Sequence, residues 1–413
     1  MKVTDEEVAR VNLIWGLFGV FVVLGIAFLF SNGKKSINYR TILVGLAIQV
    51  AFGFIVLKWS AGRAGLKWFS EKVQNVIDYA GDGVSFLFGP IADSEGFGFV
   101  FAIQVLTIII FFSALISVLY YLGVMQWFIN ILGGGLSKLL GTSKAESVSA
   151  AANIFVGQTE APLVIRPFLA NMTKSELFAV MTGGLASVSG AVLAGYALLG
   201  VPLEYLLAAS FMAAPGGLVM AKIMMPETED SAVTDFEMEK DKDSVNAIDA
   251  AARGASDGLT LALNVGAMLL AFIALIALFN GMLGGVAGWF GFKGITLEGI
   301  LGVLFSPLAF AIGVPWSEAV TAGSFIGQKL VLNEFVAYAA FAPEIPTLMP
   351  KTVIIVSFAL CGFANLSSLA ILLGGLGQLA PSRRPDIARL GIRAVAAGLL
   401  ASLLSAAIAG MFF

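Results

Sequence analysis

The chain has 413 residues, of which 58% are hydrophobic and only 12% are charged, and its mean hydropathy is +0.92. A soluble domain carries about 25% charged residues, so this composition indicates an integral membrane protein. The net charge of −3 argues against a nucleic-acid partner. With no histidine and a single cysteine, Cys361, the sequence excludes an intrachain disulfide, a Cys/His metal cluster and any histidine base.

Apolar segments long enough to cross a bilayer recur along the chain. The first, residues 11–31, follows an acidic start and has no small-residue cleavage site after it, so we expect a retained membrane helix. The expected fold is therefore an all-α integral membrane protein with eight transmembrane helices. The predicted crossings are residues 11–31, 41–57, 99–122, 178–199, 203–222, 259–281, 352–379 and 391–412.

Residues 62–80 have a different pattern. Leu66, Phe69, Val73 and Val76 recur at helical spacing, with charged residues between them. This pattern favours an amphipathic helix that lies at the membrane interface, and the alternative is a loop helix packed on protein.

Basic residues in short loops give the orientation. The loop at 34–40 and the loop at 383–389 are both rich in lysine and arginine, so we expect both to face the cytoplasm and both termini to be periplasmic. Four basic residues between positions 58 and 72 fall on the outer side and oppose this assignment. The acidic stretch 226–244 reads as a mobile cytoplasmic linker, with a regulatory role as the less favoured interpretation.

Two apolar segments, residues 145–170 and 306–343, are interrupted by glycine, proline and charged residues. Irregular backbone at membrane depth is tolerated only where protein or a water-filled cavity surrounds it, so re-entrant helical hairpins are expected here.

The two interrupted segments belong to an internal repeat. FVGQT (155–159) reappears as FIGQK (325–329). Downstream of the first copy lies GLASVSGAVLAG (184–195), and downstream of the second lies the similar segment GFANLSSLAILLG (362–374). With eight crossings the two hairpins open from opposite sides, so the repeats are expected to be inverted. Paired interrupted segments of this kind indicate the midplane site of a secondary transporter.

Polar residues concentrate in these segments. A carboxylate at the bilayer centre costs at least about 2.5–3.5 kcal/mol. We therefore expect Glu160 and Glu334 either to pair with a cation or to have a function. An ion pair, such as Arg166 with Glu160, is one alternative. The other is a pair of acceptors for ligand donors, and Gln158 and Thr159 would then help Glu160 to bind a neutral heterocycle.

Small polar residues are expected to interrupt two spans. Asn365 and Ser368 break the seventh span and can share a sugar's hydroxyl groups with Glu334. Ser187 and Gly190 are expected to unwind the fourth span and free backbone carbonyls, which are hard oxygen ligands suited to sodium. Helix packing is the alternative for each of these residues taken singly.

Four long motifs resemble the bacterial branch of the concentrative nucleoside transporters. They are VGQTEAPLVIRPFL, GVPWSEA, LVLNEFVAY and FALCGFANLSSLAILLGGLG, and the resemblance runs from about residue 95 to the end of the chain. It implies a homotrimer in the bacterial inner membrane that imports a uridine-like nucleoside by sodium symport and alternating access. The sodium ion is co-transported, and the partners are the nucleoside, the ion and the lipid bilayer.

The resemblance also implies roles for individual residues. The sodium ligands include two side chains typical of sodium-coupled members, those of Asn153 and Ser187, which favours sodium over protons. The implied sets are Gln158, Thr159 and Glu160 for the nucleobase; Glu334, Asn365 and Ser368 for the ribose; Val192, Leu261 and Phe363 for the apolar lining; and Asn153, Val156, Ser187 and Val188 for sodium, the two valines through backbone carbonyls.

The resemblance further implies a division into a fixed scaffold and a mobile transport domain. The expected parts are scaffold helices 1 and 2 at 1–60, an interfacial helix at 61–81, scaffold helix 3 at 97–124, a first transport repeat at 145–224, an acidic linker at 225–257, scaffold helix 6 at 258–284 and a second transport repeat at 300–413.

Three other classes of function compete with this interpretation. A proton-coupled carrier would use Glu160 or Glu334 as its proton acceptor. An intramembrane enzyme would use the same two carboxylates as an acid/base pair, but the chain has no histidine, Walker-type loop or metal cluster to support one. A passive channel fits poorly with carboxylates buried in two hairpins. We therefore expect a transporter and not an enzyme.

Overall fold

The computed structural model describes residues 5–92, 98–229 and 244–413, and every regular element within these ranges is helical. Most of the predicted acidic linker, residues 230–243, lies outside the described residues. Within the described part, seven helices are long and apolar enough to cross a membrane. The remaining predicted crossing, 352–379, consists of two shorter apolar helices. The chain is thus a multi-pass, all-helical membrane protein.

The helices differ sharply in burial. In each of the spans 174–198, 203–224 and 381–411, 94% of an apolar 18-residue stretch is buried. The corresponding share is 33% in the first two spans and 17% in the spans 101–121 and 247–289. The chain therefore has an inner group of helices within an outer group. The outer helices are α1 (Asp5–Leu29), α2 (Tyr39–Gly53) with the π-turn η2 (Phe54–Lys58), α3 (Ser60–Phe88), α5 (Phe101–Gln104), α6 (Leu106–Tyr121) and α12 (Ala247–Trp289).

The inner helices include two broken spans. The fourth predicted span stops at Ala186 and restarts at Gly190, and the seventh stops at Leu360 and restarts at Leu366. The expected break at Ser187 is confirmed. The inner helices are α9 (Lys174–Ala186), α10 (Gly190–Leu198), α11 (Leu203–Met224), α16 (Pro350–Leu360) and α18 (Arg384–Met411). The half-helix α17 (Leu366–Leu379) packs on α18.

Each break is closed by a side-chain cap. Ser189 accepts from the backbone N–H of Val192 at 3.4 Å, and Asn365 accepts from that of Ser368 at 2.8 Å, which starts each second half-helix. The two breaks also touch, because the N–H of Phe363 donates to the carbonyl of Ser187 at 3.1 Å.

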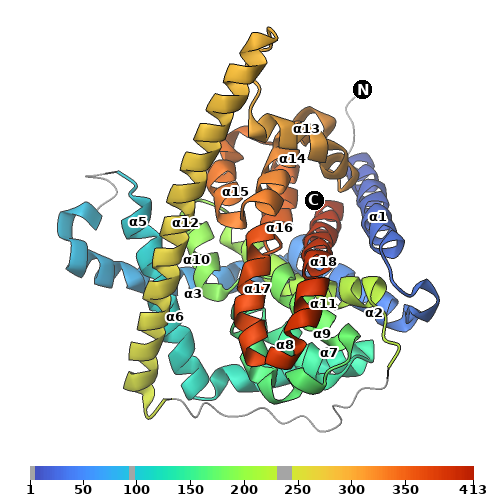
Figure 1. Cartoon of the computed structure of the whole chain (residues 1–413), viewed down its shortest axis with the longest axis vertical. Coiled ribbons are helices and arrows are strands. Elements are labelled where there is room, and N and C mark those ends of the chain that lie inside the picture. Colours follow the sequence, from blue (N-terminus) through green and yellow to red (C-terminus); the bar gives the residue numbers. More distant parts are fainter. Residues whose placement is uncertain (1–4, 93–97, 230–243) are drawn as a thin grey trace.

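Helical pairs lie at the two ends of the molecule. Figure 1 shows α7 and α8 at its lower end and α13 and α14 at its upper end, with α12 running the full height beside α6. The elements at the lower end are α7 (Val124–Leu140), α8 (Lys144–Ala152) and η4 (Ala161–Asn171); those of the upper set are α13 (Leu297–Ala311), α14 (Trp316–Val331) and α15 (Glu334–Phe341). The short turns are η1 (Lys34–Ser36), η3 (Gly89–Ala92), η5 (Ala342–Thr347) and η6 (Pro381–Arg383).

The second predicted hairpin begins later than residue 306. Residues 306–311 belong to α13, which meets α14 at an angle of 116°. Gly313 permits this corner because its φ of +111° is rarely adopted by other residues. The hairpin proper is α14 and α15, with its turn at Leu332–Asn333, whereas α8 and η4 form the first hairpin around the irregular segment 153–160.

The structure corrects two boundaries and one sequence equivalence, and it adds one helix. The segment expected at the membrane interface belongs to a single helix, α3, that extends to Phe88. Helix α7 was not expected, and α12 begins at Ala247, inside the segment assigned to the linker. FIGQK is helical within α14, whereas FVGQT is irregular, so these two matching sequences have different structures.

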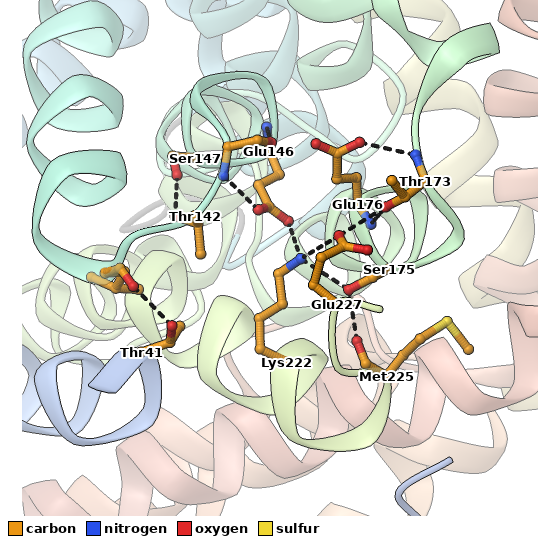
Figure 2. A network of polar contacts seen from close by, with 12 residues as sticks. Thr41, Thr142, Glu146, Ser147, Thr173, Ser175, Glu176, Lys222, Met225 and Glu227 are labelled. Atoms are coloured by element: carbon orange, nitrogen blue, oxygen red, sulfur yellow. Dashed lines mark hydrogen bonds and ion pairs between the residues drawn. The ribbon is translucent and has the colours of Figure 1, made fainter. Parts of the chain in front are cut away.

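The base of the first hairpin is fixed by a buried lysine (Figure 2). The ammonium of Lys222, at the end of α11, lies 2.8 Å from a carboxylate oxygen of Glu146 in α8 and 3.6 Å from one of Glu227. It also donates to the hydroxyl of Ser175 in α9 at 2.9 Å. The first hairpin, α9 and α11 are therefore joined into one unit at this end.

Both basic loops lie at the same end of the molecule. The guanidinium of Arg393 donates to the carbonyls of Phe30 and Met224 and to the side chain of Asn32, so the loop after α1, the end of α11 and the start of α18 are neighbours. The side-chain amide of Asn12 donates to the carbonyl of Phe413 at 2.8 Å. The beginning of α1 and the end of α18 are therefore neighbours as well.

Candidate functional site

A cavity of about 110 Å³ lies where both hairpins meet α10, α12 and α17. This is below the roughly 300–1,000 Å³ of most ligand pockets. Larger cavities of about 630 and 570 Å³ lie near Lys58 and near Lys222, and neither is lined by a predicted site residue. All nine residues expected to contact substrate line the small cavity: Gln158, Thr159, Glu160, Val192, Leu261, Glu334, Phe363, Asn365 and Ser368.

Glu334 is held at the start of α15. Asn333 caps this helix by accepting from the N–H of Val336 at 2.8 Å. One carboxylate oxygen of Glu334 accepts from the hydroxyl of Tyr196 at 3.1 Å, and the other accepts from the side-chain amide of Asn365 at 2.9 Å. A carboxylate has about four lone-pair positions, so about two remain for a ligand.

Asn365 has its orientation fixed by its own helix. Its side-chain oxygen accepts from the N–H of Ser368 at 2.8 Å and from the hydroxyl of Ser367 at 2.7 Å. The amide nitrogen must then point to Glu334, which explains why a helix cap also serves the cavity.

Gln158 joins the first hairpin to the seventh span. Its amide nitrogen donates to the hydroxyl of Ser368 at 3.3 Å. Its amide oxygen is buried and has no hydrogen-bond partner among the described residues. An unpaired buried acceptor is costly unless a ligand satisfies it, so this oxygen is available for a donor on a bound molecule.

Neither carboxylate of the cavity is part of an ion pair within the described residues. Glu160 accepts instead from the N–H of Gly157, and Arg166 is not its partner. The alternative of a structural ion pair at Glu160 or Glu334 is therefore not observed.

The four residues expected to bind sodium lie at the breaks beside this cavity and are buried. Asn153 ends α8 and Ser187 ends α9. The amide nitrogen of Asn153 donates to the carbonyl of Ser149 at 2.9 Å, but its side-chain oxygen, which faces Gly184 of α9, is unpaired in the part of the chain that the structure describes. A neutral, buried and unsatisfied oxygen suits a hard monovalent cation. Val156 and Val188 complete this set.

Sequence analysis missed Tyr196, which donates to Glu334 and stacks at 4.3 Å on Tyr338. The signal was its position within the apolar fourth span, since a buried tyrosine hydroxyl needs a hydrogen-bond partner. Ser189, Asn333 and Ser367 also line the cavity and were missed as site residues.

Three family models match consecutive parts of the chain. Residues 18–91 match the Na⁺-dependent nucleoside transporter N-terminus, residues 102–203 match a nucleoside recognition model, and residues 205–410 match the Na⁺-dependent nucleoside transporter C-terminus.

Curated proteins match over nearly the whole length. The chain is 64% identical over 406 residues to the uncharacterized transporter YutK of Bacillus subtilis, covering 97% of this chain and 100% of that protein. It is 54% identical over 410 residues to the nucleoside permease NupC of Helicobacter pylori, covering 97% of each.

Solved structures of a transporter called CNTnw match in two states. The inward-facing, substrate-bound state is 57% identical with a TM-score of 0.93, covering 97% of this chain and 98% of the other. An outward-facing state of a variant is 56% identical with a TM-score of 0.95, covering 98% and 99%. The two states of this relative imply alternating access. The chain therefore belongs to the family of Na⁺-dependent concentrative nucleoside transporters and is a transporter, not an enzyme.

Proposed function

We propose that this chain imports nucleosides across the bacterial inner membrane by sodium symport. The observation that carries the proposal is the cavity in which both hairpins and both broken spans present polar groups. Within it Glu334 is oriented by Tyr196 and Asn365, and Gln158 has a free acceptor. Hydrogen-bonding groups beside an apolar wall suit a neutral ligand that has a flat heterocycle and a sugar.

The roles divide between the two halves of the site. Gln158, Thr159 and Glu160, from the first hairpin, bind the nucleobase. The ribose hydroxyls donate to Glu334 and contact Asn365 and Ser368. The apolar wall is completed by Val192, Leu261 and Phe363.

Sodium is the proposed coupling ion. Its ligands are the side chains of Asn153 and Ser187 and the carbonyls of Val156 and Val188. The unpaired side-chain oxygen of Asn153 supports this assignment, as does the sodium dependence in the description of the matching family models.

The proposed architecture consists of inverted repeats. Each repeat has a re-entrant hairpin and a broken span, and α8 and α14 lie at opposite ends of the molecule (Figure 1). The outer group of helices forms the scaffold, with α3 as its interfacial helix, and the hairpins with α9, α10, α11, α16, α17 and α18 form the transport domain. Three such chains assemble, each with both termini in the periplasm.

Uptake measurements test the function directly. Purified protein in proteoliposomes should concentrate radiolabelled uridine when an inward sodium gradient is applied, and choline substitution should abolish this. Full uptake in choline at a fixed proton gradient would instead support the proton-coupled alternative, and no concentrative uptake in either condition would overturn the proposal.

A cross-link tests the mechanism. A Cβ at Gly45 of α2 would lie 2.3 Å from a methyl carbon of Val219 in α11, so this pair joins the scaffold to the transport domain at disulfide range. The oxidised Gly45→Cys, Val219→Cys protein should bind uridine but not transport it, because the site moves as one unit. Each single variant is the control. Loss of binding together with transport would show that the two halves of the site must separate.

A further inference from the structure

Lys329 is a fully buried cation without a carboxylate partner. It lies in the last turn of α14 with 0% of its surface exposed, and no carboxylate of the described residues forms an ion pair with it. Its ammonium donates to the carbonyl of Ala359 at 2.8 Å and to the hydroxyl of Ser402 at 3.1 Å. The buried Lys222, in contrast, contacts Glu146 at 2.8 Å. Glu334 interacts electrostatically with this ammonium but forms no ion pair with it. A cation at membrane depth without an ion-pair partner is expensive, so a function is expected for it.

The ammonium of Lys329 lies at the C-terminal end of the half-helix α16. The carbonyls in the last turn of α16 lack intrahelical partners because the helix breaks at Leu360. The hydroxyl of Tyr338 donates to Ser357 at 2.7 Å, the N–H of Cys361 donates to Phe358 at 3.2 Å, and Lys329 donates to Ala359. A helix C-terminus carries about half a negative charge, which a cation placed there stabilises.

The first half of the molecule has the same parts without a lysine. Helix α8 of the first hairpin brings Asn153 to the end of α9, and helix α14 of the second hairpin brings Lys329 to the end of α16. At α9 the structure leaves the side-chain oxygen of Asn153 unpaired, and at α16 an ammonium satisfies the carbonyl of Ala359. At the end of α16 the cation is a side chain of the protein, whereas at the end of α9 the neutral side chain of Asn153 holds the corresponding place.

We infer that Lys329 is a tethered cation that takes, at the seventh span, the place that sodium takes at the fourth. This inference rests on the proposed sodium site. The ammonium links the second hairpin to α16 and to Ser402 of α18 at all times, so that half of the site is assembled without an ion. Only the first half needs sodium, and one sodium ion then suffices for each nucleoside.

Removing the charge should create a second ion requirement. Lys329→Gln keeps an N–H donor and removes the charge, whereas Lys329→Met keeps the aliphatic stem. In either variant sodium should be needed at both half-helix ends. The Hill coefficient of sodium for uridine uptake should then rise from about 1 towards about 2, with the half-saturating sodium concentration raised at least about tenfold. Sodium chloride, compared with choline chloride, should also raise the melting temperature of the variant more than that of the parent.

Lys351→Gln is the matched control. Lys351 is also buried and unpaired with a carboxylate among the described residues, but it lies in the first turn of α16 and donates to Asn12 at 2.8 Å. Its replacement should leave the Hill coefficient and the ion-dependent melting shift unchanged. Lys329→Arg should retain the parent's sodium dependence.

Two results would overturn the inference. One is a Lys329→Gln or Lys329→Met protein whose sodium curve has the parent's shape, with or without a lower maximal rate, because a packing role changes yield and rate but not ion number. The other, for variants too unstable to reconstitute, is a melting temperature in membranes with no added dependence on sodium. If the parent itself shows no sodium-dependent uptake, the proposed function fails and the result is distinct from both.

Discussion

Replacing Glu334 by glutamine removes the charge and one acceptor oxygen from the cavity while it preserves the size of the side chain. In the parent, Tyr196 and Asn365 each donate to a different carboxylate oxygen, at 3.1 and 2.9 Å. The amide oxygen of the variant must face Asn365, because two N–H donors repel each other. The amide nitrogen then faces the hydroxyl of Tyr196, which can accept.

The expected loss follows from this geometry. The acceptor positions open to a ligand fall from about two to about one, and the remaining acceptor is neutral. A hydrogen bond to a charged group contributes about 1.5–3 kcal/mol, so uridine should bind about 10- to 150-fold more weakly.

Isothermal calorimetry of the purified protein measures this loss, with 2′,3′-dideoxyuridine as the matched ligand. This analogue lacks the 2′- and 3′-hydroxyls and keeps the 5′-hydroxyl, so its affinity should change little in Glu334→Gln if Glu334 accepts from the 2′- and 3′-hydroxyls. Tyr196→Phe, which keeps the carboxylate and removes one of its donors, should weaken uridine binding less than Glu334→Gln does. Unchanged uridine affinity, or an equal loss for both ligands, would refute the assignment of Glu334 to the ribose.

Two further predictions concern the ion and the base of the first hairpin. Ser187→Ala and Asn153→Ala should each raise the sodium concentration for half-maximal uptake, and a parental sodium curve in either variant would exclude that side chain as a ligand. Lys222→Met should lower stability by about 3–5 kcal/mol, because it leaves the carboxylate of Glu146 buried without its ion partner. Glu227→Gln should cost less than about 1 kcal/mol, since that side chain is 35% exposed, and thermal melts with equal shifts for the two variants would contradict this reasoning.

The parts of the fold that sequence predicts best are those with a local chemical cause. The sequence predicts breaks at Ser187 and Gly190 and at Asn365 and Ser368, and the structure has them at 187–189 and 361–365, with Ser368 inside α17. Serine, glycine and asparagine cap new helices and interrupt old ones. The residues that line the cavity could be predicted because they are polar groups within apolar segments, where burial of such a group is costly unless it is paired or functional. Their convergence at one cavity is a geometric result, and their roles in binding stay predictions.

The parts that sequence did not predict depend on packing between distant segments. Helix α7 contains Gly133, which reads as a helix breaker, but a Cβ there would lie 2.6 Å from the backbone of Val148 in α8. The glycine therefore permits a close helix contact. The start of α12 reads as a linker because it is polar, yet Ala250, Gly254 and Gly258 are buried at four-residue spacing, and Gly254 faces Ser117 of α6.

Sequence identity also misled in one place. FVGQT and FIGQK share three residues, but the turn of the second hairpin is set by Asn333, which caps α15 one turn farther along the chain. The position of the helix cap therefore determines the local structure more than the three shared residues do. Lys329, the last residue of FIGQK, lies in the helix for this reason and reaches α16 from there.

The contact between the two breaks gives a physical basis for coupling between the ion and the substrate. Ser187, a proposed sodium ligand, accepts through its carbonyl from the N–H of Phe363, a proposed substrate contact, at 3.1 Å. Gly362 makes this approach possible, since a Cβ there would lie 2.9 Å from the carbonyl of Ala186. An ion that orders the backbone at Ser187 therefore orders the backbone that presents Phe363, and a nucleoside held against Phe363 stabilises the same backbone in return. Such reciprocity is what thermodynamic linkage requires of two ligands that are carried together.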